Sequence, residues 1–193
     1  LKPFGPEERK LALFFIKLLL IWLSWKVIIF ILGEEAVPLD DRIFPALSAQ
    51  WEAWNLQIAS FIIEQGAALL KLLGYEAYAW QRTAWIRNTG GVVMGNYCIG
   101  IQLMYYYVML LLVAPLRIYK KIGGMVTGII VTFLLNIARV SGLCLVALYI
   151  PQYMFIAHDH VFNVIVFGTL IGIYYLLTKN AAPSRKAQPR TDE

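Results

Sequence analysis

Four apolar runs, each near the length that crosses a lipid bilayer, constrain the fold of this chain more than any other feature. A transmembrane helix needs about 20 predominantly apolar residues, and the runs cover residues 11–32, 98–114, 122–150 and 161–178. Hydrophobic residues make up 60% of the sequence, whereas soluble domains contain roughly 45–50%. The sequence therefore predicts an all-α integral membrane protein, a polytopic bundle of four to six helices.

The basic residues predict the orientation of this bundle. The net charge is +5, but lysine and arginine flank the apolar runs, so we expect them to set topology and expect no nucleic-acid partner. The basic residues gather at the N-terminus, in 115–121 and in the tail 180–193. In contrast, 33–50 is acidic, and 151–159 contains neither lysine nor arginine. We therefore expect a multi-pass protein of the cytoplasmic (inner) membrane, in contact with the lipid bilayer. Residues 1–179 form one polytopic domain, and the polar tail lies in the cytoplasm.

The segment between the first two runs must begin and end outside. Residues 51–73 have helical character but carry Glu52, Gln57, Glu64 and Lys71. We interpret them as an amphipathic helix at the outer interface, or one partly embedded in the bundle. The alternative is a full span with the first helix inverted, which conflicts with the positive-inside rule.

Residues 75–97 predict a small extracytoplasmic β-hairpin before Cys98. β-forming residues stand on both sides of the turn sequence Asn88-Thr89-Gly90-Gly91. An exposed hairpin edge has unpaired backbone groups, so it does not lie in lipid.

Cys98 opens the second apolar run. On a continuous helix, Cys98, Gln102 and Tyr105 fall at positions i, i+4 and i+7 and share one polar face. The alternative is that Cys98 packs as a small hydrophobic residue. The other cysteine, Cys144, also lies in an apolar run, so a disulfide framework is not expected.

Arg139 lies inside the third run. An arginine at the centre of a membrane helix costs about 2.5–3.5 kcal/mol on insertion scales and indicates a functional site. A run that enters at Ile122 and rises about 1.5 Å per residue places Arg139 roughly one turn below the outer surface. Asn136 shares its helix face. The alternative is a structural arginine that snorkels outward or pairs with a carboxylate.

The sequence His158-Asp159-His160 stands at the outer start of the fourth run and contains the only two histidines. One interpretation is a helix-capping aspartate with two interfacial histidines. Another is a metal site, which would need Cys98 or Glu64 as a third ligand. We predict no metal and no cofactor.

The predicted topology brings these residues to one side of the membrane. A cation or histidine beside a thiol favours the reactive thiolate. A cysteine, an arginine and a histidine together are suited to acyl transfer, because they supply a nucleophile, a stabiliser of negative charge and a proton carrier.

The motifs "YCIGIQ", "NIARVSGL" and "HDHVFN" resemble the exosortase/archaeosortase family of membrane cysteine transpeptidases. The family signature is Cys-x-Gly at a helix start, Asn-x-x-Arg-[Ile/Val] in the next helix, and a histidine at the start of the following one. The resemblance covers residues 75–178. This chain is compact, with four or five spans where many bacterial members have about eight, and it has Ile99 where small residues are common.

The resemblance implies a role for each matching residue. Cys98 is the expected nucleophile, Arg139 stabilises the thiolate or oxyanion, and His158 is the general acid/base, with His160 as the alternative. The supporting residues are Asn136, Gln102, Tyr105 and Asp159.

The resemblance also implies a substrate. It is a membrane-anchored protein with a C-terminal sorting signal made of a short motif, a helix and a basic cluster. Cleavage at the outer face through a thioester on Cys98 would pass the protein to an unidentified surface acceptor. The alternatives are a non-enzymatic membrane scaffold or assembly factor, and a metal-dependent membrane hydrolase that uses His158, Asp159 and His160.

Overall fold

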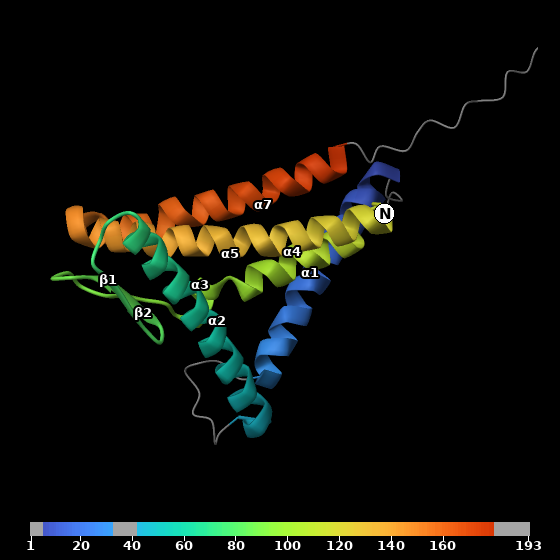
Figure 1. Cartoon of the computed structure of the whole chain (residues 1–193). Helices are drawn as coiled ribbons and strands as arrows, with labels where there is room; N and C mark the ends of the chain where they lie inside the picture. The colour runs from blue at the N-terminus through green and yellow to red at the C-terminus, as the bar shows by residue number, and fades with distance from the viewer. Residues whose placement is uncertain (1–5, 33–41, 180–193) are drawn as a thin grey trace, which may run out of the picture.

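The computed structural model describes residues 6–32 and 42–179 and has the architecture of a helical membrane protein (Figure 1). Within these ranges, three helical segments are long and apolar enough to cross a bilayer: Ala12–Leu32 in α1 (Pro6–Leu32), α5 (Ile118–Tyr149), and Pro151–Lys179, which ends in α7 (Phe162–Lys179). A shorter apolar helix, α4 (Ile101–Val113), packs on α5. The predicted fold class, all-α and membrane-embedded, is confirmed.

Figure 1 shows α5 and α7 side by side along most of their length, with α1 and α2 (Pro45–Leu72) forming a V whose apex points away from them. The acidic residues Glu34, Glu35, Asp40 and Asp41 and the predicted cytoplasmic tail lie outside the described residues.

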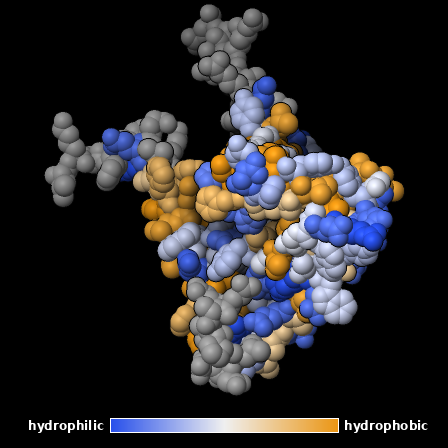
Figure 2. All heavy atoms as spheres, turned by 90° about the vertical axis from the view of Figure 1, so that its left-hand side faces the viewer, coloured by the Kyte–Doolittle hydropathy of each residue, from blue (hydrophilic) through white to orange (hydrophobic). Residues whose placement is uncertain are grey.

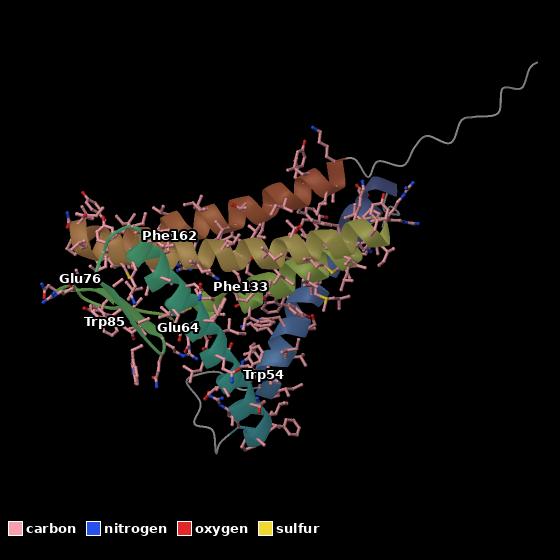
Figure 3. All side chains as sticks on the ribbon, in the orientation of Figure 1. Trp54, Glu64, Glu76, Trp85, Phe133 and Phe162 are labelled. Atoms are coloured by element: carbon pink, nitrogen blue, oxygen red, sulfur yellow. The ribbon has the colours of Figure 1, made fainter. Side chains whose placement is uncertain are left out.

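Helix α2 begins six residues before the predicted start at residue 51. Pro45 occupies its first turn, where its fixed φ and missing N–H suit a helix start. The buried positions recur every three or four residues and form a stripe that packs against α5. Trp54 and Glu64 are exposed (Figure 3). Gly66 permits this packing, because a Cβ there would lie 2.7 Å from Val140 Cγ1. Helix α2 is not among the segments apolar enough to span a membrane.

The segment before Cys98 forms three antiparallel strands in the order β1-β2-β3, where the sequence predicted two. Strands β2 (Thr83–Ile86) and β3 (Val92–Val93) flank the predicted Gly-containing turn. Strand β1 (Ala77–Trp80) adds to β2 through a two-residue turn at Gln81 and Arg82, in which Gln81 has φ +46°. That turn contains no glycine, so it lacks the usual sequence signal for positive φ.

The sheet is anchored to the helices on one face. Ala84 and Ile86 are buried in the same core as Ile62 of α2 and Cys144 of α5. Arg87, directly after β2, forms an ion pair at 2.8 Å with Glu76, which directly precedes β1 and is labelled in Figure 3. Figure 2 views this end of the molecule, where hydrophilic and hydrophobic residues are interspersed. The sheet therefore packs against α2 and α5 and leads directly into the Cys98 segment.

Glycines let the helices approach closely at the other end of the bundle. A Cβ at Gly128 would lie 2.1 Å from the Tyr107 ring, and the Tyr107 hydroxyl donates to the Gly124 carbonyl at 3.2 Å. Nearer the sheet, Phe162 (labelled in Figure 3) packs in the same way over Gly142. These contacts fix α4 and α7 against α5.

Two predicted elements differ from the structure. The run 98–114 is not one helix: α3 (Asn96–Ile99) ends at Gly100, and α4 starts afresh after it. The segment 151–159 is not a loop, because a 3₁₀ turn (Pro151–Tyr153), α6 (Met154–Ile156) and a π-helical turn (Ala157–Val161) run into α7. Cys98, Gln102 and Tyr105 therefore do not share one continuous helix face.

Candidate active site

A backbone break holds Cys98 at the end of a short helix. Gly100 has φ +83°, which only glycine adopts without strain. Because of the break, the Ile99 carbonyl takes no part in the hydrogen bonds of a helix. Asn136 Nδ2 on α5 donates to it instead, at 2.7 Å. The Gly100 carbonyl then accepts from Met104 N at 2.9 Å and starts α4. Asn136, predicted as a supporting residue, thus fixes the backbone that carries Cys98.

A second contact, from the sheet, holds the segment that carries Cys98. Arg82 Nη1 donates to Asn96 Oδ1 at 2.5 Å and lies 3.4 Å from the Met94 carbonyl. Asn96 is the first residue of α3. The β1–β2 turn is therefore tied to the helix that carries Cys98, and this contact was not predicted from the sequence.

Arg139 lies on α5, 7% exposed, and faces the cysteine and histidine. Its Nη2 is 4.0 Å from Cys98 Sγ and 3.1 Å from His158 Nε2, and it donates to the His158 carbonyl at 3.2 Å. The guanidinium thus stands beside both reacting side chains.

The π-helical turn presents His158 to Cys98. Such turns insert one residue into a helix and are frequent at functional sites. His158 Nε2 is 3.4 Å from Cys98 Sγ, and His158 Nδ1 is 2.5 Å from Asp159 Oδ1. Because a guanidinium only donates, the contact of Arg139 Nη2 with His158 Nε2 assigns the ring lone pair to Nε2 and the proton to Nδ1, which donates to the Asp159 carboxylate. That lone pair faces the Cys98 thiol and the Arg139 guanidinium.

A cavity of about 250 Å³ opens beside this group and is lined by Cys98, Arg139 and Asn136 among others. Gln102 also lines it and donates to the Tyr106 hydroxyl at 3.1 Å. Sequence reasoning missed Tyr106 and Asn163, which both line the cavity. Asn163 Nδ2 donates to the Asp159 carbonyl at 2.8 Å. Their spacing, four residues after Gln102 and Asp159, is the one available signal, because residues four apart share a helix face.

Several predicted residues lie elsewhere. The Tyr105 hydroxyl pairs with Ser24 of α1 at 2.7 Å, away from the cavity lining. The His160 ring packs near Phe155, with ring centroids 6.1 Å apart. Cys144 is fully buried, and its Sγ lies 3.7 Å from the Ala84 carbonyl.

The structure gives no support to the two alternative interpretations. Within residues 6–32 and 42–179, no three His, Cys, Asp or Glu side chains are grouped as metal ligands. The Arg139 guanidinium, itself a cation, occupies the space beside His158 and Cys98. It therefore faces inward and is not presented to the carboxylate of a partner protein.

Comparison with known proteins identifies the family of the chain. The family model described as transmembrane exosortase (Exosortase_EpsH) matches residues 10–176. No curated protein and no solved structure gives a significant match. The match includes the helices that carry Cys98, Arg139 and His158 and extends over most of the chain, so this membrane protein belongs to the transmembrane exosortase family.

Proposed function

We propose that this exosortase is a membrane cysteine peptidase or transpeptidase that forms a thioester on Cys98. The observation that carries the proposal is the chain of contacts from Cys98 Sγ to His158 to Asp159, with Arg139 beside the first two. A nucleophile within reach of a base, with the base oriented by a third group, is the arrangement of covalent catalysis.

In the acylation step, His158 Nε2 accepts the Cys98 thiol proton, and the thiolate attacks the carbonyl carbon of a substrate peptide bond. The carbon–sulfur bond forms while the carbonyl electron pair moves to oxygen. Arg139 is placed to stabilise that negative charge. Collapse of the intermediate breaks the carbon–nitrogen bond, and the Nε2 proton passes to the leaving amine.

In the second step, an amine or water enters and gives a proton to His158 Nε2 as it attacks the thioester. The carbon–sulfur bond breaks, and the Cys98 sulfur takes the proton back. An amine yields transpeptidation and water yields hydrolysis, and both leave the enzyme unchanged. Asp159 holds the imidazole in the tautomer that both steps require.

The positions of the basic residues support an extracytoplasmic site. Lys120 and Lys121 lie in the first turn of α5, and the positive-inside rule assigns this end to the cytoplasm. Arg139 lies 18 residues after Lys121, a rise of about 27 Å. The hydrocarbon core is about 30 Å thick, so Arg139 lies close to its outer boundary. The substrate that fits this placement is a membrane-anchored protein with a C-terminal motif, helix and basic cluster, cleaved at the outer face of the inner membrane. Its surface acceptor is unidentified.

The test is co-expression with candidate substrates that have such C-terminal segments. Cys98→Ala and Arg139→Ala are expected to insert and fold but to stop removal of the C-terminal segment. Cys144→Ala is the matched control, because its thiol is buried in a core and contacts no reacting group. Processing of a substrate by Cys98→Ala would refute the proposed function.

A further inference from the structure

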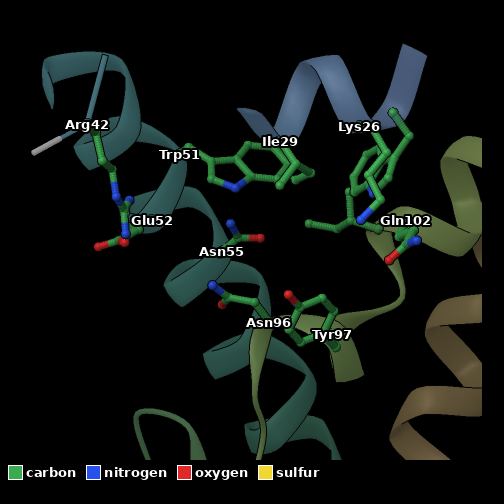
Figure 4. Close-up of a pocket in the computed structure, with 11 residues that line it drawn as sticks. Lys26, Ile29, Arg42, Trp51, Glu52, Asn55, Asn96, Tyr97 and Gln102 are labelled. Atoms are coloured by element: carbon green, nitrogen blue, oxygen red, sulfur yellow. The ribbon is translucent and has the colours of Figure 1, made fainter. Parts of the chain in front are cut away.

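A second cavity, of about 80 Å³, lies between α1, α2 and the Cys98 segment (Figure 4). Figure 4 shows Asn55 reaching into it from α2 and Lys26 extending from α1 toward Gln102. Neither Asn55 nor Lys26 has a role in the chemistry proposed above. The cavity has the volume of about two to three water molecules in the liquid.

Asn55 presents an unsatisfied polar group to this cavity. Its side chain is 2% exposed, and Nδ2 has no hydrogen-bond partner among the described residues. A buried donor without a partner costs about 1–3 kcal/mol. A molecule that enters the cavity and offers an acceptor removes this penalty.

The charges on the lining favour an anionic acceptor. Lys26 has neither an ion pair nor a hydrogen bond with any described residue, so no described residue compensates its positive charge. The other two charged residues, Arg42 and Glu52, pair with each other at 2.7 Å. A carboxylate can accept hydrogen bonds from both Asn55 and Lys26, whereas a neutral amide leaves the lysine charge uncompensated.

This cavity adjoins the catalytic one. Tyr97 and Gln102 line both, and Tyr97 directly precedes Cys98. A substrate chain held at Cys98 therefore reaches the second cavity with a side chain only a few residues away, because an extended chain advances about 3.3 Å per residue.

We propose that the cavity lined by Lys26, Asn55 and Gln102 is a specificity subsite that binds a carboxylate side chain of the substrate, within about three residues of the bond that Cys98 attacks. The assignment rests on the proposed function. The subsite makes Asn55 and Lys26 specificity-determining residues, which touch the substrate but not the reacting atoms.

The test uses the full-length protein in nanodiscs and heptapeptides with dehydroalanine at the centre. The Cys98 sulfur adds to the carbon–carbon double bond of dehydroalanine and its proton to the other carbon, so a stable thioether forms. Glutamate or glutamine occupies each of the six other positions in turn, with alanine elsewhere. The rate of Cys98 modification is followed by mass spectrometry.

In at least one register, the glutamate peptide is expected to modify Cys98 about tenfold faster than its glutamine counterpart, as for a hydrogen bond to a charged group. Lys26→Met and Asn55→Leu should each bring this ratio close to one. Asn55→Asp should make the glutamine peptide the faster one. Lys17→Met is the matched control, because Lys17 lies on the same helix but outside the cavity lining, and it should keep the wild-type ratio.

Equal rates for glutamate and glutamine in every register would overturn the subsite, as would a preference that survives both Lys26→Met and Asn55→Leu. If Cys98 is modified without a preference for glutamate, the subsite is refuted but the proposed function is not. Failure of every peptide to modify Cys98, with iodoacetamide also unreactive there, would overturn both.

Discussion

The substitution Gly100→Ala perturbs the backbone break without touching a reacting side chain. Gly100 has φ +83°, and a Cβ there would lie 3.2 Å from Asn136 Nδ2 and 3.3 Å from Thr132 Cγ2. Asn136 has little freedom to move aside, because its amide is held by the Ile99 carbonyl at 2.7 Å.

The expected loss of stability can be worked from these contacts. An L-residue in the left-handed region costs about 1–2 kcal/mol. If the Asn136 hydrogen bond also breaks, the Ile99 carbonyl is left unsatisfied, which costs about 1–3 kcal/mol more. The backbone contribution alone lowers the folded-to-unfolded ratio by a factor of about 5–30.

Two measurements follow the effect: the free energy of unfolding in a detergent titration, and the rate of Cys98 alkylation by iodoacetamide under folding conditions. We expect a loss of at least about 1 kcal/mol and slower alkylation, because Cys98 moves away from His158 and Arg139. Gly95→Ala is the matched control, since Gly95 has φ −76° and nothing lies within 4 Å of its Cβ position. Equal behaviour of the two variants would refute the argument that the Gly100 break positions Cys98.

The remaining predictions concern side chains around the site. The first two are measured as the rate of substrate processing, and the third as the free energy of unfolding. Arg139→Leu should reduce that rate by about 10²–10³, the usual effect of removing one oxyanion donor, and an unchanged rate would contradict its role. Asp159→Asn should slow processing at least about tenfold, because an amide does not hold His158 in one tautomer; His160→Ala serves as control and should process normally. Asn136→Ala should destabilise the fold by about 1–3 kcal/mol, because the Ile99 carbonyl loses its hydrogen-bond donor. An unchanged free energy of unfolding would contradict this role of Asn136.

Local patterns in the sequence predicted the features that depend on composition. The apolar run around Arg139 is one continuous helix, because nothing in it interrupts the 1.5 Å rise. Arg139 itself stood out, since a charge in such a run is unfavourable without partners. The structure brings Cys98, Arg139 and His158 within 4.0 Å of one another, an arrangement that the predicted topology also anticipated.

Features set by distant contacts were not predictable. Gly100 lies in an apolar run that favours a helix, and the group that stabilises the break, Asn136, comes 36 residues later in the sequence. The π-helical turn at His158 and the Gln81 turn carry no local sequence signal either. The short α4 is a consequence of the same break, which is why Tyr105 faces Ser24 of α1 instead of the cavity.

The most direct test of the thioester mechanism is to trap the intermediate. A co-expressed substrate is processed, the reaction is quenched in acid, and the peptide that contains Cys98 is examined by mass spectrometry. The mechanism predicts a substrate-derived acyl group on Cys98 that neutral hydroxylamine removes, with no adduct on Cys144. An acyl group on another residue, or processing by Cys98→Ala, would contradict it.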